Sequence, residues 1–122
     1  MKEKRTLVIG ASEHRWRYSF IAVNKLIEYG YEVIALGKKK GQINGVPIET
    51  GKKELKDIDT VTLYLNPFNQ EDYYDYILNT IKPKRIIFNP GAENPILEKL
   101  AHRNGIQTEN ACTLVMLSTG QY

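Results

Sequence analysis

The chain contains few of the residues from which small proteins build disulfide frameworks or metal centres. Its 122 residues include one cysteine, Cys112, and two histidines. A single cysteine excludes an intrachain disulfide framework and a cysteine-rich zinc site, and it is typical of proteins in a reducing compartment. We therefore expect no metal site and a cytoplasmic location.

Long hydrophobic runs and familiar catalytic motifs are also absent. The apolar run that begins near the N-terminus, at Leu7, already ends at Gly10, so it is far too short for a signal peptide or a membrane span. The sequence has no H-E-x-x-H, C-x-x-C or G-x-S-x-G motif and no P-loop. We expect neither attachment to a membrane nor catalytic residues, and therefore no enzyme activity.

Length and composition indicate one globular domain over residues 1–122. Apolar residues make up 42% of the chain and charged residues 25%, which are ordinary values for a soluble globule. A chain of this length buries about two-thirds of the surface that it exposes when unfolded. It can therefore fold around its own core, without a disulfide or a structural metal.

Three segments have the pattern of helices. The spacing of apolar residues predicts a helix at about residues 18–29. Asn69 resembles the N-cap of a second helix, which Pro83 ends. Asn94 resembles the N-cap of a third helix, with Pro95 at its first position.

Five short runs rich in β-branched and aromatic residues alternate with these helices. Asn44-Gly45 indicates a turn after the second run, and residues 111–117, after the last run, favour one or two helical turns. The predicted strands, in chain order, are residues 7–9, 32–36, 60–65, 85–88 and 106–108.

This alternation predicts a doubly wound, Rossmann-like α/β fold, with one parallel five-stranded sheet and helices on both faces. We expect the strand order 3-2-1-4-5. Ligands of such sheets bind beyond the carboxyl ends of the strands, where the strand order reverses. The site is therefore expected between the first and fourth strands, at residues 10–18 and 88–94, with residues 36–45 and 65–69 beside them.

Positive charge is concentrated in the first third of the chain. Residues 1–40 contain nine lysines or arginines and four acids, whereas the rest contains eight and ten. After the second strand, Gly37 is followed by Lys38, Lys39 and Lys40, where a NAD-binding domain usually places an acid for the ribose hydroxyls. Lysine suits a ribose phosphate, which favours coenzyme A (CoA) or NADP over NAD. The three lysines would equally suit a solvated loop tip.

The loop after the first strand has features of a phosphate-binding turn. Gly10, followed by Ala11 and Ser12, allows a tight turn and the close approach of a ligand. The helix that follows points its N–H groups and the positive end of its dipole at an anion. The complete G-x-G-x-x-G fingerprint is absent. Arg15 and Arg17 are each able to bind phosphate oxygens, or to lie on the surface.

Two further strands end in Asn-Pro. Asn66-Pro67 ends the third strand and Asn89-Pro90-Gly91 ends the fourth, at the same edge of the predicted sheet. Proline removes a backbone donor and leaves carbonyls and side-chain amides to face a ligand. The same residues would also serve as simple strand ends.

Six segments, taken in order along the chain, form a specific set. They are Gly10-Ala11-Ser12, Arg17-Tyr18-Ser19, Gly37-Lys38-Lys39-Lys40-Gly41 with Gly45-Val46-Pro47-Ile48, Thr62-Leu63-Tyr64-Leu65-Asn66-Pro67, Phe88-Asn89-Pro90-Gly91-Ala92-Glu93-Asn94-Pro95 and Ala111-Cys112-Thr113-Leu114-Val115. Together they resemble the stand-alone CoA-binding domain family, over essentially the whole chain. This family is similar to the amino-terminal CoA-binding domain of the succinyl-CoA synthetase alpha subunit. Those synthetases use a phosphorylated histidine in a second domain. We expect only one domain in this chain, so the resemblance does not imply their ligase chemistry.

The resemblance implies roles for the expected loops. Backbone amides from Ala11 to Arg15 would hold the phosphates, and Lys40 would meet the nucleotide end of the ligand. Asn66-Pro67 would border the adenine or pantetheine path. Residues 89–91 would receive the pantetheine arm.

Together these observations predict a protein that binds CoA or an acyl-CoA and acts as a carrier, sensor or accessory module. A minimal NADP-dependent oxidoreductase is the alternative, against which stand the missing fingerprint and the missing substrate domain. Nucleic-acid binding is the weakest interpretation, because no recognition helix is evident, and we expect no nucleic-acid or membrane partner. A homo-oligomer, a partner enzyme and thiol exchange between Cys112 and CoA stay open. The residues expected to bind the cofactor are Gly10, Ala11, Ser12, Arg15, Arg17, Tyr18, Gly37, Lys38, Lys39, Lys40, Asn66, Pro67, Asn89, Pro90 and Gly91.

Overall fold

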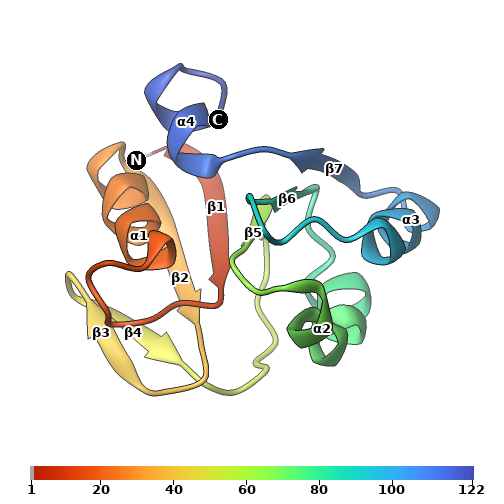
Figure 1. Cartoon of the computed structure of the whole chain (residues 1–122), viewed down its shortest axis with the longest axis horizontal. Coiled ribbons are helices and arrows are strands. Elements are labelled where there is room, and N and C mark those ends of the chain that lie inside the picture. Colours follow the sequence, from red (N-terminus) through yellow and green to blue (C-terminus); the bar gives the residue numbers. More distant parts are fainter. Residues whose placement is uncertain (1) are drawn as a thin grey trace.

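The computed structural model describes residues 2–122, and Met1, the first residue of the predicted domain, lies outside them. The strands of this part of the chain form a single sheet (Figure 1). They are β1 (Lys2–Ile9), β2 (Tyr31–Leu36), β3 (Gly41–Ile43), β4 (Val46–Glu49), β5 (Thr60–Leu63), β6 (Arg85–Phe88) and β7 (Gln107–Asn110).

Helices cover both faces of the sheet, as the alternating pattern predicts (Figure 1). Successive strand residues point to opposite faces, so Val8 packs with α1 and α4, whereas Leu7 and Ile9 pack with η2 and α3. No helix of the described residues is long and apolar enough to cross a membrane. The helices are α1 (Tyr18–Glu28), α2 (Pro67–Gln70), η1 (Glu71–Tyr73), η2 (Tyr76–Ile81), α3 (Pro95–Arg103) and α4 (Thr113–Ser118).

The predicted strand count and order are wrong, although the mostly parallel, doubly wound α/β architecture is confirmed. The sheet has seven strands in the order β3-β4-β2-β1-β5-β6-β7. All neighbours are parallel except β3, which is antiparallel to β4. In the numbering of the five predicted strands the order is 2-1-3-4-5. The reversal therefore lies between β1 and β5, and not between the first and fourth predicted strands.

A hairpin on the outer edge of β2 explains this order. Asn44 and Gly45 both have positive φ, 48° and 84°, which is the conformation of a two-residue hairpin turn between β3 and β4. The hairpin places β4 against β2, where Ala35 pairs with Ile48. Because β4 occupies that edge of β2, β5 pairs with the free edge of β1 instead, from Thr6 to Ile9.

The second predicted helix begins earlier than expected. Its N-cap is Asn66, whose Oδ1 accepts a hydrogen bond from Asn69 N, so the prediction of Asn69 as the N-cap is wrong. Pro67 fits the first helical position, where its missing N–H costs no hydrogen bond. The helix is also irregular, because it continues through η1 into the π-helical η2.

The other helix ends follow the sequence closely. The first helix begins at Tyr18, as predicted. Asn94 caps α3, where its Oδ1 accepts hydrogen bonds from two backbone amides of the first turn, and Pro95 takes the first position. The tail forms α4, in agreement with the expectation of one or two helical turns. The last strand, β7, begins one residue later than predicted and ends at Asn110.

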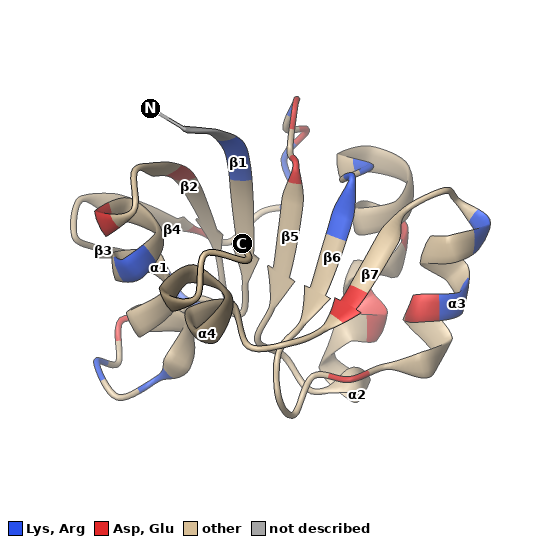
Figure 2. Ribbon diagram, turned by 90° about the horizontal axis from the view of Figure 1, so that it is seen from above, with Lys and Arg blue, Asp and Glu red and all other residues tan. Residues whose placement is uncertain are grey.

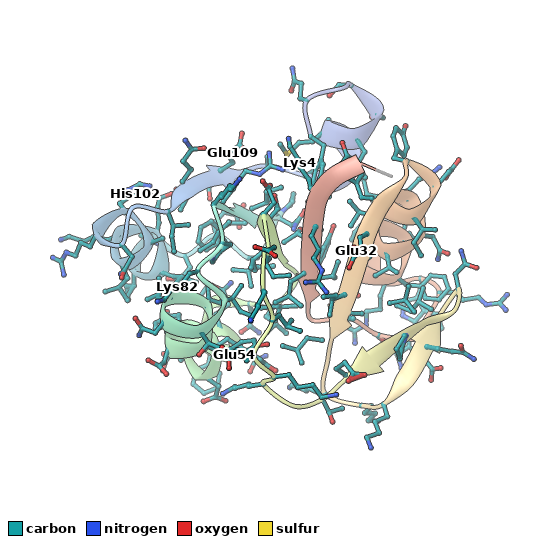
Figure 3. All side chains as sticks on the ribbon, turned by 180° about the vertical axis from the view of Figure 1, so that it is seen from behind. Lys4, Glu32, Glu54, Lys82, His102 and Glu109 are labelled. Atoms are coloured by element: carbon teal, nitrogen blue, oxygen red, sulfur yellow. The ribbon has the colours of Figure 1, made fainter. Side chains whose placement is uncertain are left out.

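Tyr122 covers the amino end of the sheet. Its hydroxyl is hydrogen-bonded to the Thr6 side chain, and its ring packs edge-on against Tyr31 with centroids 4.9 Å apart. The Arg85 guanidinium lies 4.7 Å from the ring centroid, and Lys4 donates to the Tyr122 carbonyl. Figure 3 shows Lys4 at this end of the molecule. The side chain is only 7% exposed, and this burial raises the pKa of Tyr122.

The raised pKa predicts a loss of stability in alkaline solution. An unfolded tyrosine ionises near pH 10.0, before the folded one, so the stabilising contribution is complete below pH 10.0 and falls above it. We expect Tyr122→Phe to cost about 1 kcal/mol at neutral pH, from the lost Thr6 bond. The same change should reduce the alkaline fall by up to about 1.4 kcal/mol per pH unit.

Urea unfolding monitored between about pH 7 and pH 11 measures both effects. Tyr18→Phe is the matched control, because Tyr18 is 68% exposed. An identical pH dependence for Tyr122→Phe and the unchanged protein would contradict this account of Tyr122.

Candidate functional site

The loops after β1 and β2 lie against each other at the carboxyl edge of the sheet. Gly10 N and Ala11 N both donate to Leu36 O, at 2.9 and 3.0 Å. A Cβ atom on Gly37 would lie 2.3 Å from Ala11 O, so only glycine fits at this contact. Figure 2 shows the arrowheads of β1, β5 and β6 directed toward the same edge. The resemblance implied that the Ala11 amide holds a phosphate. This amide already donates to Leu36 O, so it is not free to do so.

Phosphate binding would instead use the amides that follow Ala11 and the start of α1. Arg17, the N-cap of α1, makes no side-chain capping bond, and the first turn contains no acid. The first N–H groups of a helix lack partners within the helix, and together with the dipole they attract anions. The Ser12 hydroxyl accepts from His14 N at 3.1 Å and so shapes the approach to this helix end. Arg15, Arg17 and Tyr18 are all exposed beside it.

The three lysines between β2 and β3 are exposed and have no carboxylate partner within ion-pair distance. Among residues 2–122, none of the ion pairs involves Lys38, Lys39 or Lys40. The pKa of the Glu49 carboxyl group is lowered by its bond to Lys53 and, to a smaller extent, by the charge of Lys40. The lysines are therefore available to an anionic ligand.

Glu13 joins these two loops, and sequence reasoning overlooked it. Its Oε2 accepts a hydrogen bond from Gln42 N at 2.9 Å. The carboxyl group lies beside Gly41, where a Cβ atom would come within 2.2 Å of Glu13 Cδ. The available signal was weak: Glu13 is the one acid between Gly10 and Tyr18, in a loop that otherwise contains two arginines.

The reversed strand order brings the β5–α2 loop to the other side of the first loop. Tyr64 N donates to Ile9 O at 2.9 Å, and a Cβ atom on Gly10 would lie 3.0 Å from the Tyr64 carbonyl carbon. Gly10 has a φ of 99°, which also favours glycine. Asn66 and Pro67 follow at once and are exposed. The first loop is therefore flanked by the lysine turn on one side and by Asn66-Pro67 on the other.

Asn89 does not face a ligand, contrary to the expectation for its side-chain amide. It is 2% exposed, and its Nδ2 donates to Thr62 Oγ1 at 2.7 Å and to Leu63 O at 2.9 Å. Its Oδ1 accepts from Thr113 N at 2.9 Å. The amide thus joins β5, β6 and α4, and its role is structural. Pro90, Gly91 and Glu93 are exposed in this loop, and Gly91 N donates to Glu93 Oε1 at 2.8 Å.

A buried pair of amides holds the β5–α2 and β6–α3 loops together. Gln70, which is fully buried, donates from Nε2 to Leu65 O at 2.8 Å and to Ala92 O at 2.7 Å. Asn94 Nδ2 donates to Gln70 Oε1 at 2.9 Å. These bonds place Pro90 and Gly91 at the same edge as the other loops, although no hydrogen bond joins them directly to the first loop in the described residues.

Exposed apolar side chains also gather at this edge. The large apolar residues that are exposed in the described chain all lie just after the carboxyl end of a strand, in the first loop or the first turn of the helix that follows. Isolated exposed apolar residues are ordinary, but their concentration at one edge suits a ligand with an apolar body. They are Trp16, Tyr18, Phe68, Ile96 and Val115.

Groups with catalytic potential are sparse near the site. Cys112 is half-buried at the N-cap of α4, and the nearby Tyr64 hydroxyl is buried beside the Thr62 and Thr113 side chains. Burial raises the pKa of Tyr64, so its phenol stays protonated at neutral pH. His102 lies on α3, hydrogen-bonded to the Thr108 hydroxyl. Residues 2–122 contain no group of three or more acids, histidines or cysteines that could hold a metal ion.

Comparison with known proteins identifies the family. A family model described as a CoA binding domain matches residues 4–118. The chain belongs to this CoA-binding domain family. No curated protein sequence matches it significantly.

Solved structures share the fold of this chain. One crystal structure, of a protein described only as uncharacterized, shares 46% identity and a TM-score of 0.96, with 100% of both chains covered. A hypothetical protein from Pyrococcus horikoshii is 23% identical with a TM-score of 0.85, covering 95% of this chain and 82% of that one. A dinucleotide forming acetyl-coenzyme A synthetase from Ca. Korarchaeum cryptofilum is 16% identical with a TM-score of 0.68, covering 87% of this chain and 25% of that one. The last two likenesses concern the fold alone.

The two Asn-Pro loops of this CoA-binding domain protein predict different effects on stability. Asn89→Ala removes a buried amide and leaves its partners unsatisfied, so we expect a loss of about 3 kcal/mol. Asn66→Ala removes an exposed N-cap, for which about 1 kcal/mol is expected. Urea unfolding of both variants at neutral pH measures these losses. Equal losses in the two variants would refute the structural role assigned to Asn89.

Proposed function

We propose that this protein binds CoA or an acyl-CoA at the carboxyl edge of the sheet. We also propose that it has no catalytic apparatus of its own and serves as a carrier, sensor or accessory module. The observation that most supports binding is the unpaired lysine turn, residues 38–40, held against the first loop through Gly37. Family membership supports the same ligand class.

The proposed site matches the three chemical parts of CoA. The lysine turn would bind the 3′-phosphate of the ribose, because ammonium groups attract phosphate strongly. The N-terminus of α1 would bind the diphosphate. Residues 66–67 and 90–91, with the exposed Phe68 and Ile96, would border the less polar pantetheine arm. The lysine turn alone would suit the ribose phosphate of NADP as well, but family membership supports CoA and not NADP, the alternative cofactor.

The lysine turn predicts how strongly affinity depends on the 3′-phosphate. We expect CoA to bind about tenfold or more tightly than 3′-dephospho-CoA in isothermal titration calorimetry. Replacing Lys38, Lys39 and Lys40 together with alanine should weaken CoA binding by about 10- to 100-fold. The same triple variant should bind the two ligands equally, because the group that distinguishes them has lost its partners.

A matched triple variant separates this effect from net charge. Lys25→Ala, Lys56→Ala and Lys84→Ala together remove the same charge from exposed positions away from the site, so CoA affinity should change little. No heat from CoA or acetyl-CoA at millimolar concentration would refute the proposed function. Saturation by NADPH without a response to CoA would favour the oxidoreductase instead.

The absence of catalysis has its own test. Acetyl-CoA incubated with the protein should release no free thiol above the uncatalysed rate, as measured with a thiol reagent. Thioester hydrolysis in proportion to protein concentration would show that the binding site also catalyses a reaction.

A further inference from the structure

We infer that Glu13 determines which phosphorylated ribose this site accepts. Its carboxylate accepts a hydrogen bond from a free ribose 2′-hydroxyl and therefore excludes nucleotides that bear a 2′-phosphate. This inference rests on the proposed function, because it assumes that the adenosine end of the ligand lies at the lysine turn.

The geometry leaves one carboxylate oxygen of Glu13 free. Oε2 is held by Gln42 N at 2.9 Å, whereas the described residues offer no hydrogen bond to Oε1. The side chain is exposed, so a ligand can reach Oε1. Gly41 provides the space for this position, since a Cβ atom there would lie 2.5 Å from Oε1. One oxygen therefore positions the carboxylate, and the other can bind.

The position is the one at which an adenosine ribose is expected. In doubly wound nucleotide-binding sheets, an acid near the end of the second strand usually accepts from a ribose hydroxyl. Here β2 ends at Leu36, and the turn that follows it is cationic. Glu13 supplies the missing carboxylate from the loop after β1, and places it at Gln42, two residues beyond Lys40.

A carboxylate beside a cationic turn suits one isomer of a ribose phosphate. The 2′ and 3′ positions are adjacent on the ring, so a 3′-phosphate on the lysines leaves the 2′-hydroxyl as a donor to Glu13. A 2′-phosphate would instead place its negative charge against the carboxylate, and like charges in contact are strongly unfavourable. Glu13 and the lysines together select a 3′-phosphorylated ribose, whereas the lysines alone would bind either isomer.

The isomers adenosine 3′,5′-bisphosphate and adenosine 2′,5′-bisphosphate test this directly, because they differ only in the place of one phosphate. Calorimetry should give about tenfold or tighter binding of the 3′,5′ isomer by the unchanged protein. Glu13→Gln removes the charge but keeps an amide oxygen for Gln42 N, so the loop stays in place. We expect this variant to lower the ratio to about threefold or less, chiefly through tighter binding of the 2′,5′ isomer.

Two further variants separate charge at this position from charge in general. Gly41→Ala keeps the charge of Glu13 but displaces its carboxyl group, and should lower the ratio as well. Glu28→Gln removes an exposed acid at the far end of α1, and should leave the ratio unchanged. Thermal midpoints within a few degrees of the unchanged protein confirm that each variant is folded.

The outcomes separate this inference from the proposed function. An unchanged ratio in Glu13→Gln, with CoA still bound, overturns the role of Glu13 and leaves the proposed function standing. An equal gain for both isomers also overturns it, because Glu13 would then repel anions without distinguishing them. If neither isomer nor CoA binds the unchanged protein, both proposals fall.

Discussion

The pairing of β4 with β2 is the constraint on which the rest of the structure depends. Because the β3–β4 hairpin occupies the outer edge of β2, β5 can extend the sheet only beside β1. The loops after β2, β1 and β5 then emerge side by side, and the strand order reverses within the group. With β5 beyond β2, as in the order expected from the sequence, the Asn66-Pro67 loop would lie far from the first loop. A short hairpin thus decides which loops lie side by side at the proposed site.

Glycine allows these neighbouring loops to touch. Gly37 lies against the Ala11 carbonyl, Gly41 against the Glu13 carboxyl group, and Gly10 against the Tyr64 backbone. Any larger residue at Gly37 would force the two loops apart, since the opposing atom there is backbone and cannot rotate away. On the other side of the site, buried side-chain amides hold neighbouring segments together: Gln70 and Asn89 donate hydrogen bonds to main-chain carbonyls of those segments. The rigid parts of the site are therefore either glycine contacts or buried hydrogen bonds.

The sequence predicts local structure well and long-range pairing poorly, for physical reasons. Pro95 after Asn94 has one favourable arrangement, so the start of α3 was predictable. The Asn44-Gly45 turn was recognised, but the choice of partner for β4 depends on which strand edges are free, and no local pattern records this. Asn89 was expected to face a ligand because an Asn-Pro pair looks the same whether its amide is buried or exposed. Glu13 was overlooked because its partner, Gln42, is distant in sequence.

The electrostatics of the site follow from the same arrangement. A cluster of lysines alone attracts any polyanion, so it can provide affinity and speed of association but little discrimination. Discrimination requires a group that penalises the wrong ligand, and an acid fixed next to the cations does this. Such an acid must not form an ion pair with the lysines, which would neutralise both. The hydrogen bond from Gln42 N holds the Glu13 side chain against β3, and in the described residues no ion pair joins Glu13 to these lysines. In the proposed site, attraction and exclusion would thus lie within the same turn.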